Sequence, residues 1–133
     1  MENLAYPLTG ALTLMCLLVY FWTGIVVARA RSRLGVRAPA TAGPDEFNRI
    51  YRAHVNTHEQ IVMFLPAAWL FALTVGDCWA ALAAAVWCVG RVLYVIGYAR
   101  AAEKRELGFA LTALPMLVCL LGSLGVILWH FIA

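Results

Sequence analysis

The sequence predicts an all-α integral membrane protein, a bundle of four helices that forms one domain over residues 1–133. Hydrophobic residues make up 64% of the chain and charged residues 13%, whereas soluble proteins average about 45–50% and about 25%. The mean hydropathy is +0.82, and a small soluble domain leaves too much of its surface in water to hide that much apolar area. The same composition excludes a disordered chain, a small disulfide-bonded domain and a nucleic-acid-binding protein.

The first and last spans are the stretches 3–28 and 107–133, which contain no Asp, Glu, Lys or Arg. Each exceeds the roughly 20 residues that a helix needs to cross a bilayer, so we expect helices over residues 4–30 and 107–132. A cleaved signal peptide is not expected, because Glu2 is the only charge before the first apolar stretch and the basic residues follow that stretch.

The second and third spans are expected over residues 45–75 and 78–105. Each combines a short apolar run, 60–76 or 78–90, with a segment that continues helically and carries charge. Gly76 and Asp77 predict a tight turn between these two spans. Pro39 and Pro44 make residues 35–44 a loop, and Asp45 is expected to cap the helix that follows it.

Basic residues determine the expected orientation. Nine of the ten Lys and Arg residues lie between spans one and two or between spans three and four, and Arg91 is the exception. The nine are Arg29, Arg31, Arg33, Arg37, Arg49, Arg52, Arg100, Lys104 and Arg105. The positive-inside rule then places both basic loops in the cytoplasm and both termini on the non-cytoplasmic side. The abundance of Ala and Arg suits a GC-rich gene, which favours a bacterial inner membrane over the endoplasmic reticulum.

Polar residues of spans two and three are expected to meet at the cytoplasmic boundary of the membrane. Arg52, Asn56 and Glu59 share one helical face, and so do Tyr94, Tyr98 and Arg105. Counting 1.5 Å per residue from Asp77 predicts three level pairs: Glu59 with Tyr94, Asn56 with Tyr98, and Arg52 with Arg105. A carboxylate near the hydrocarbon edge is costly, which makes Glu59 a functional candidate.

Structural explanations also exist for these groups. Tyr residues commonly form an aromatic belt at the membrane interface, and Arg side chains near helix ends extend to the headgroups. Glu59 could simply form an ion pair with Arg52 or Arg91.

The chemistry of these side chains fits a zwitterionic ligand with additional carboxylates. Guanidinium groups bind carboxylates, a carboxylate such as Glu59 binds an ammonium group, and Asn56 can both donate and accept. Glutathione has these groups, and it also has a thiol. A cation beside that thiol would lower its pKa from about 8.5 and favour the reactive thiolate.

Two segments resemble the signatures of the MAPEG family, the membrane-associated proteins of eicosanoid and glutathione metabolism. Residues 47–59 resemble the family pattern F-x-R-x-x-R-A-x-x-N-x-x-E, and residues 90–100 contain the pattern R-x-x-Y-x-x-G-Y. Arg105 follows Tyr98 at the spacing seen in the leukotriene-forming synthase and the microsomal glutathione transferases of the family.

The resemblance implies a homotrimer that binds glutathione, as a co-substrate, between neighbouring subunits near the cytoplasmic face. It implies that glutathione is held by Arg52, Asn56, Glu59, Tyr94 and Tyr98. Arg105 would be the catalytic residue that stabilises the thiolate, and Arg31 would reach glutathione from the adjacent subunit. His54 and Arg100 match less closely. The implied activity is a membrane-bound glutathione transferase, or a glutathione peroxidase, acting on apolar electrophiles or lipid hydroperoxides from the bilayer.

Departures from the family pattern leave alternatives open. Gln60 stands where the family often has Tyr, and Ser32 replaces a second Arg of the leukotriene-forming synthase, which argues against leukotriene synthesis. Some members of the family bind lipid without catalysis, so a non-catalytic lipid-binding or scaffold protein is one alternative. A small four-helix drug/proton exporter is another, but such exporters need a carboxylate in span one, which has none here.

No metal site is expected. His54 and His58 have the i, i+4 spacing of metal ligands on a helix, but Glu59 faces about 100° away from His58 and no third ligand is evident. The four Cys residues show no ligand spacing, and those within apolar runs are expected to be buried as small hydrophobic residues. Gly90 and Gly97 predict close helix packing.

Overall fold

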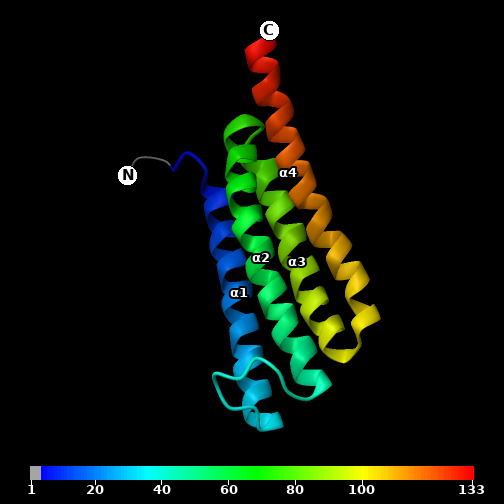
Figure 1. Cartoon of the computed structure of the whole chain (residues 1–133). Coiled ribbons are helices and arrows are strands. Elements are labelled where there is room, and N and C mark those ends of the chain that lie inside the picture. The colour runs from blue at the N-terminus through cyan, green and yellow to red at the C-terminus, as the bar shows by residue number, and fades with distance from the viewer. Residues whose placement is uncertain (1–3) are drawn as a thin grey trace.

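The computed structural model describes residues 4–133 as four long helices and one short 3-10 turn (Figure 1). The elements are α1 (Pro7–Leu34), α2 (Asp45–Thr74), α3 (Asp77–Arg100), η1 (Ala102–Arg105) and α4 (Glu106–Ile132). Helices α2 and α3 form the centre of the bundle, and α1 and α4 each pack against both of them. This arrangement confirms the predicted all-helical class. Glu2, which entered the predicted charge pattern, lies outside the described residues.

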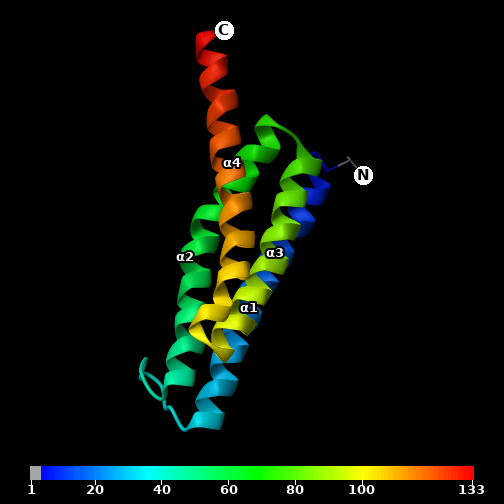
Figure 2. The same cartoon turned by 90° about the vertical axis from the view of Figure 1, so that its right-hand side faces the viewer.

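Helices α1, α3 and the segment 102–132 are each long and apolar enough to cross a membrane. Helix α2 is as long, but charged side chains occupy its first half and only its second half is uniformly apolar. It nevertheless packs lengthwise against the other three helices (Figure 2). The apolar half of α2 is therefore part of the same helical bundle as the three apolar helices.

The predicted end of the third span is wrong. Helix α3 ends at Arg100, and Ala101 adopts an extended conformation with φ −159° and ψ 147°. The chain must reverse here so that α4 can pack back along α3, and a continuous helix to Arg105 would prevent this reversal. Arg105 therefore lies in η1 and does not share a helical face with Tyr94 and Tyr98.

The turn between α2 and α3 forms at the predicted residues. Gly76 has a φ of 137°, in the left-handed region that favours glycine. The Asp77 carboxylate accepts hydrogen bonds from the backbone N–H groups of Leu8, at 3.1 Å, and Thr9, at 2.7 Å. It therefore caps the start of α1 from another helix. The predicted cap at Asp45 is wrong, because Asp45 already lies in the first turn of α2 and the preceding residue is Pro44.

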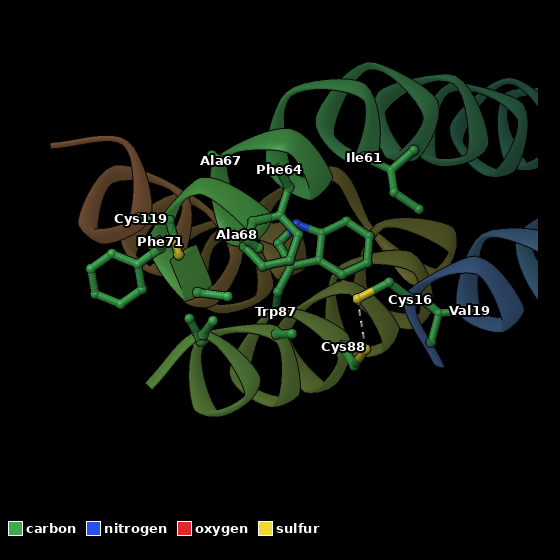
Figure 3. Close-up of a cluster of buried hydrophobic side chains, with 14 residues drawn as sticks. Cys16, Val19, Ile61, Phe64, Ala67, Ala68, Phe71, Trp87, Cys88 and Cys119 are labelled. Carbon is green, nitrogen blue, oxygen red and sulfur yellow. Dashed lines mark hydrogen bonds between the residues drawn. The ribbon is translucent and has the colours of Figure 1, made fainter. Parts of the chain in front are cut away.

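The apolar core is built from two aromatic rings and many small residues. Phe64 and Trp87 stack with ring centroids 5.2 Å apart (Figure 3). Alanines of α2 and α3 surround them and allow the helices to approach: Ala67, Ala68, Ala80, Ala83 and Ala84. Cys16, Cys88 and Cys119 are buried as predicted, whereas Cys78 is exposed, and all four are free thiols.

Glycines bring α3 into close contact with η1 and α4, as the close packing predicted for Gly97 and Gly90 requires. A Cβ atom on Gly90 would lie 2.6 Å from Leu111 Cβ, and one on Gly97 would lie 2.2 Å from the Lys104 carbonyl oxygen. On α4, a Cβ on Gly108 would lie 2.3 Å from the Tyr94 backbone nitrogen. This contact fixes the position of Tyr94, and of the neighbouring Arg91, relative to α4.

The two ends of the bundle differ in charge. The α1–α2 loop and η1 lie at one end, while the start of α1, the α2–α3 turn and the end of α4 lie at the other (Figures 1 and 2). All basic residues except Arg91 belong to the loop end. The side of the membrane that this end faces stays a prediction.

Candidate functional site

Two adjoining pockets lie between α2, α3 and α4 toward the loop end. The outer pocket has a volume of about 410 Å³ and is lined by Asn56, Tyr94, Arg105, Glu106 and Phe109. The inner chamber has a volume of about 250 Å³ and is lined by Asn56, Glu59, Gln60, Met63, Arg91, Tyr94 and Phe109. The two pockets share three lining residues, Asn56, Tyr94 and Phe109, and are therefore adjacent.

A hydrogen bond and two ring contacts organise the outer pocket. Asn56 Nδ2 donates to the Tyr94 hydroxyl at 2.7 Å, which joins α2 to α3. The rings of Tyr94 and Tyr98 lie 5.7 Å apart, and the Arg105 guanidinium lies 4.8 Å from the centroid of the Tyr98 ring. A cation over an aromatic face is attracted to it. This contact holds Arg105 at the pocket although Arg105 lies outside α3.

The predicted pairing of Asn56 with Tyr98 is wrong by about one helical turn. Helix α2 ends at Thr74 and α3 begins at Asp77. In two antiparallel helices, a residue of one lies level with the residue of the other that is equally far from the midpoint of the connection. This midpoint precedes Asp77. Counting from the midpoint brings Asn56 opposite Tyr94, as the hydrogen bond shows. Glu59 accordingly shares the inner chamber with Arg91.

Arg91 is a buried cation without a carboxylate partner among residues 4–133. Its side chain is 1% exposed, and its Nη2 donates to Thr112 Oγ1 at 3.0 Å. Its guanidinium also lies 4.6 Å from the ring centroid of Tyr94. Within residues 4–133 the structure forms one ion pair, between Arg33 and Glu46. Glu59 is therefore not paired with Arg52 or Arg91, and the structural explanation of Glu59 is wrong for the described chain.

Arg31, on α1, and His54, on α2, lie where these two helices meet, on the side of α2 away from the two pockets. They line a separate pocket of about 390 Å³ together with Tyr20, Tyr51 and His58, among others. Arg31 Nη1 donates to the Ala40 carbonyl at 2.7 Å, which ties α1 to the following loop. His54 Nδ1 lies 2.7 Å from Thr23 Oγ1, and His58 Nδ1 lies 3.1 Å from the Tyr20 hydroxyl. Across residues 4–133 no three potential metal ligands come together.

The structure leaves two other predicted residues apart from both pockets. Arg52 and Arg100 are exposed, and neither forms a side-chain hydrogen bond with another described residue or lines a described pocket. Five predicted residues are therefore brought together, namely Asn56, Glu59, Tyr94, Tyr98 and Arg105.

The prediction missed the participation of Gln60, Arg91 and Phe109 in the site. Gln60 Oε1 and Arg91 Nε belong to residues that line the inner chamber, and both are buried atoms without a hydrogen-bond partner in the described part of the chain. Arg91 could have been found from the sequence, because it is the only charge between Cys78 and Ala99, and intramembrane charges mark functional sites. Phe109 carries no such signal, because apolar residues fill all of α4.

The arrangement can bind a small ligand that carries both charges and a nucleophile. Donors and aromatic faces surround the outer pocket, with the Arg105 cation at its edge. An acceptor, Glu59, and a buried cation, Arg91, line the inner chamber.

Comparisons with known proteins agree with this description. The model of the MAPEG family matches residues 9–125. An uncharacterized protein of Synechocystis sp. is 45% identical over 119 residues, which is 90% of this chain and 87% of the relative. Leukotriene C4 synthase of Bos taurus is 38% identical over 127 residues, 94% of this chain and 83% of the relative. Microsomal glutathione S-transferase 2 of Homo sapiens is 36% identical over 112 residues, 84% of this chain and 75% of the relative. A family match over most of the chain, with relatives of this similarity, shows that the protein belongs to the MAPEG family.

Proposed function

We propose that this protein is a membrane-bound glutathione transferase that activates the glutathione thiol for attack on apolar electrophiles. The observation that carries the proposal is the outer pocket of Asn56, Tyr94 and Arg105, which continues into a chamber with Glu59 and Arg91. The names of two relatives, a leukotriene C4 synthase and a glutathione S-transferase, support the same chemistry.

Arg105 is the proposed catalytic residue. A guanidinium beside the thiol stabilises the thiolate and makes it available at neutral pH. The thiolate sulfur attacks the electrophilic carbon, a sulfur–carbon bond forms, and the leaving group departs with its electron pair. With a lipid hydroperoxide the sulfur attacks the terminal oxygen instead. The lipid alcohol is released, and a second glutathione then yields glutathione disulfide and water.

Glutathione is proposed to contact Asn56, Glu59, Tyr94 and Tyr98 within one chain. The position of Arg31, on α1, and of His54, on the face of α2 that packs against α1, supports a homotrimer, because a neighbouring copy could present that side of the bundle to the same ligand. Arg52 and Arg100 are exposed at the loop end and are proposed to attract the carboxylates of glutathione. The loop end is proposed to face the cytoplasm of a bacterial inner membrane.

The proposed electrophile differs from the precursor of leukotrienes. Ser32 lies next to Arg31 and donates a hydrogen bond to the Ala28 carbonyl at 3.4 Å. Because its side chain is a neutral hydroxyl, Ser32 does not supply the second cation that an Arg at this position would place beside Arg31. Non-physiological electrophiles such as chloronitroaromatics and model lipid hydroperoxides are the appropriate first substrates.

The decisive test is an ultraviolet difference titration of the detergent-purified protein with glutathione, in which thiolate absorbance is followed against pH. We expect thiolate well below the free pKa of about 8.5, and we expect this signal to disappear in Arg105→Ala. Glutathione that binds but stays protonated would favour the non-catalytic scaffold. No binding would contradict the proposed function, and lipid extraction would then identify the natural ligand.

A further inference from the structure

Two buried thiols face each other across the contact between α1 and α3. Cys16 Sγ, on α1, lies 3.4 Å from Cys88 Sγ, on α3, and either thiol can donate the hydrogen bond between them (Figure 3). Both cysteines are free thiols. Neither of them lines the outer pocket or the inner chamber. The fold therefore brings together two oxidisable groups that the proposed glutathione chemistry does not use.

The pair lies near the middle of the apolar layer. Cys16 follows the start of α1 at Pro7, and Cys88 follows the start of α3 at Asp77. Both helices start at the same end of the bundle (Figure 1). At 1.5 Å per residue the two thiols lie about 14 Å and about 16 Å from that end, which is close to half of the roughly 30 Å thickness of the hydrocarbon layer. Ions and water-soluble thiols are excluded from this depth, so the reaction partner must be apolar.

An apolar groove between α1 and α3 gives a lipid access to Cys88. The groove has a volume of about 460 Å³, and every lining residue other than Cys88 is apolar. Met15, Val89 and Leu93 form exposed borders of the groove. Cys16 is fully buried and does not line it. Acyl chains are the apolar molecules that surround membrane-spanning helices, so Cys88 is the thiol that an acyl chain can contact and Cys16 is its inner partner.

The apolar surroundings decide which oxidation can occur. An ionised thiol in such a medium would carry a large desolvation cost, whereas the transfer of a hydrogen atom from a neutral thiol creates no charge. Lipid peroxyl radicals accept hydrogen atoms and are attached to acyl chains. We propose that Cys16 and Cys88 form a dithiol site that reduces lipid peroxyl radicals and becomes an interhelical disulfide.

The reaction proceeds in two one-electron steps. A first peroxyl radical takes the hydrogen atom of the Cys88 thiol, which gives a lipid hydroperoxide and a Cys88 thiyl radical. The Cys16 thiol passes its hydrogen atom to that radical across the 3.4 Å contact, so the thiyl radical moves to Cys16 and Cys88 is a thiol again. A second peroxyl radical takes this hydrogen atom, and the two thiyl radicals combine to form the S–S bond. Two peroxyl radicals and two thiols thus give two hydroperoxides and one disulfide.

The test uses the full chain, with its thiols reduced, in liposomes of a polyunsaturated phosphatidylcholine. A lipid-soluble azo initiator generates peroxyl radicals in the presence of a metal chelator. Conjugated-diene absorbance measures how long the protein delays lipid oxidation, and peptide mass spectrometry identifies the disulfide. We expect a disulfide between Cys16 and Cys88 to accumulate during the delay, and lipid oxidation to accelerate once its formation is complete.

Cysteine variants separate the roles of the two thiols. The delay is measured relative to the double variant Cys16→Ala/Cys88→Ala, which reports all other hydrogen-atom donors of the chain. Cys88→Ala should lose the whole of this delay, because Cys16 does not reach the groove. Cys16→Ala should shorten it to about half, because one transferable hydrogen atom remains. Cys119→Ala is the matched control and should keep the full delay, since Cys119 is equally buried and forms no hydrogen bond with another cysteine of residues 4–133.

Access through the groove is tested separately from the thiols. Ala85→Leu keeps both cysteines and places a larger apolar side chain in the groove. It should slow the formation of the disulfide, while its melting temperature in detergent shows that the fold is retained. An unchanged rate in this variant would contradict entry of the radical through the groove.

Three results would overturn the proposal. The first is a delay in the unmodified protein that is no longer than in the double variant, and the second is the absence of a disulfide between Cys16 and Cys88. The third is a disulfide that forms equally fast with a purified lipid hydroperoxide and no initiator, because that reaction is a two-electron oxidation. None of these measurements contains glutathione, so their outcome is independent of the proposed transferase activity.

Discussion

Helix α2 carries polar side chains on two opposite faces, and these faces differ in how their hydrogen bonds are satisfied. On the α1 side, His54 bonds to Thr23 and His58 bonds to Tyr20, and the rings of Tyr20 and His54 stack at 5.3 Å. On the side of α3 and α4, buried atoms of Gln60 and Arg91 have no hydrogen-bond partner among the described residues. We call the first face complete, because its polar groups bond to each other within the described residues, and the second incomplete, because it leaves buried atoms without a partner there.

This difference separates structural polar groups from ligand-binding ones. Hydrogen bonds between Thr23 and His54 compensate the desolvation of both groups, so their net effect is to hold α1 against α2. An unpaired guanidinium has the opposite effect and lowers stability until an anion arrives. Changes on the α1 side should therefore reduce stability, and changes on the other side should reduce binding or turnover.

The largest effect is expected at Arg105. Arg105→Ala should lower kcat with glutathione and a chloronitroaromatic by about 100-fold or more, as removal of a charge-stabilising donor does in other active sites. The Kd of glutathione should change much less, because the lost interaction is with the reacting thiolate. Steady-state kinetics and calorimetry on the same preparation measure both. Equal losses in turnover and binding would contradict this role.

Gly108→Ala should be the most destabilising single substitution of the α3–α4 contact. Its Cβ would lie 2.4 Å from Tyr94 Cα, which is backbone and cannot move aside. We expect a loss of about 2–3 kcal/mol in the free energy of unfolding, together with weaker glutathione binding. Gly125→Ala is the matched control on the same helix, because its Cβ would have no neighbour within 4 Å. Thermal unfolding in detergent compares the two, and similar melting temperatures would contradict the close contact.

Glu59→Gln tests the incomplete face at its exposed edge. The substitution keeps the shape and removes the negative charge that would attract an ammonium group. Glutathione affinity should fall about 10-fold, while the melting temperature of the ligand-free protein stays the same. An unchanged Kd would show that Glu59 does not contact the ligand.

Thr23→Val tests the complete face. It removes the hydroxyl that bonds to His54 Nδ1 and keeps the side-chain volume. The free energy of unfolding should fall by about 1 kcal/mol, with the Kd of glutathione within twofold of the original. A loss of affinity as large as that of Glu59→Gln would remove the distinction between the faces.

The smallest effect is expected at the ion pair of Arg33 and Glu46, which is exposed and outside both faces. The hydrogen bond from Arg33 lowers the pKa of Glu46 below its ordinary value of 4.5. The pair therefore adds stability above that pH, and this contribution disappears as the pH falls through the lowered pKa. Glu46→Gln should be slightly less stable than the parent at neutral pH and equal to it in acid. A difference that grows in acid would contradict this sign.

Much of the architecture could be predicted because its signals are local. Uncharged stretches indicated the helices α1 and α4, and Gly76 with Asp77 indicated the α2–α3 turn. The family patterns named the side chains that meet in the outer pocket. Asp77 also caps the start of α1, and this second role could not be predicted. Its partners, Leu8 and Thr9, are 69 and 68 residues away in the sequence.

Helical periodicity by itself determined which residues share a face within one helix, such as Tyr94 and Tyr98, and composition determined that these faces lie in a membrane protein. Tertiary structure decided the register between helices, because a level pair depends on where two helices end as well as on the spacing within each. It therefore brought Asn56 to Tyr94 and placed Arg105 on a separate turn. Packing against α4 also decided that Arg91 contacts Thr112 and no carboxylate. Whether a charge is paired depends on the side chains of all the helices around it. It can therefore be determined only from the assembled bundle.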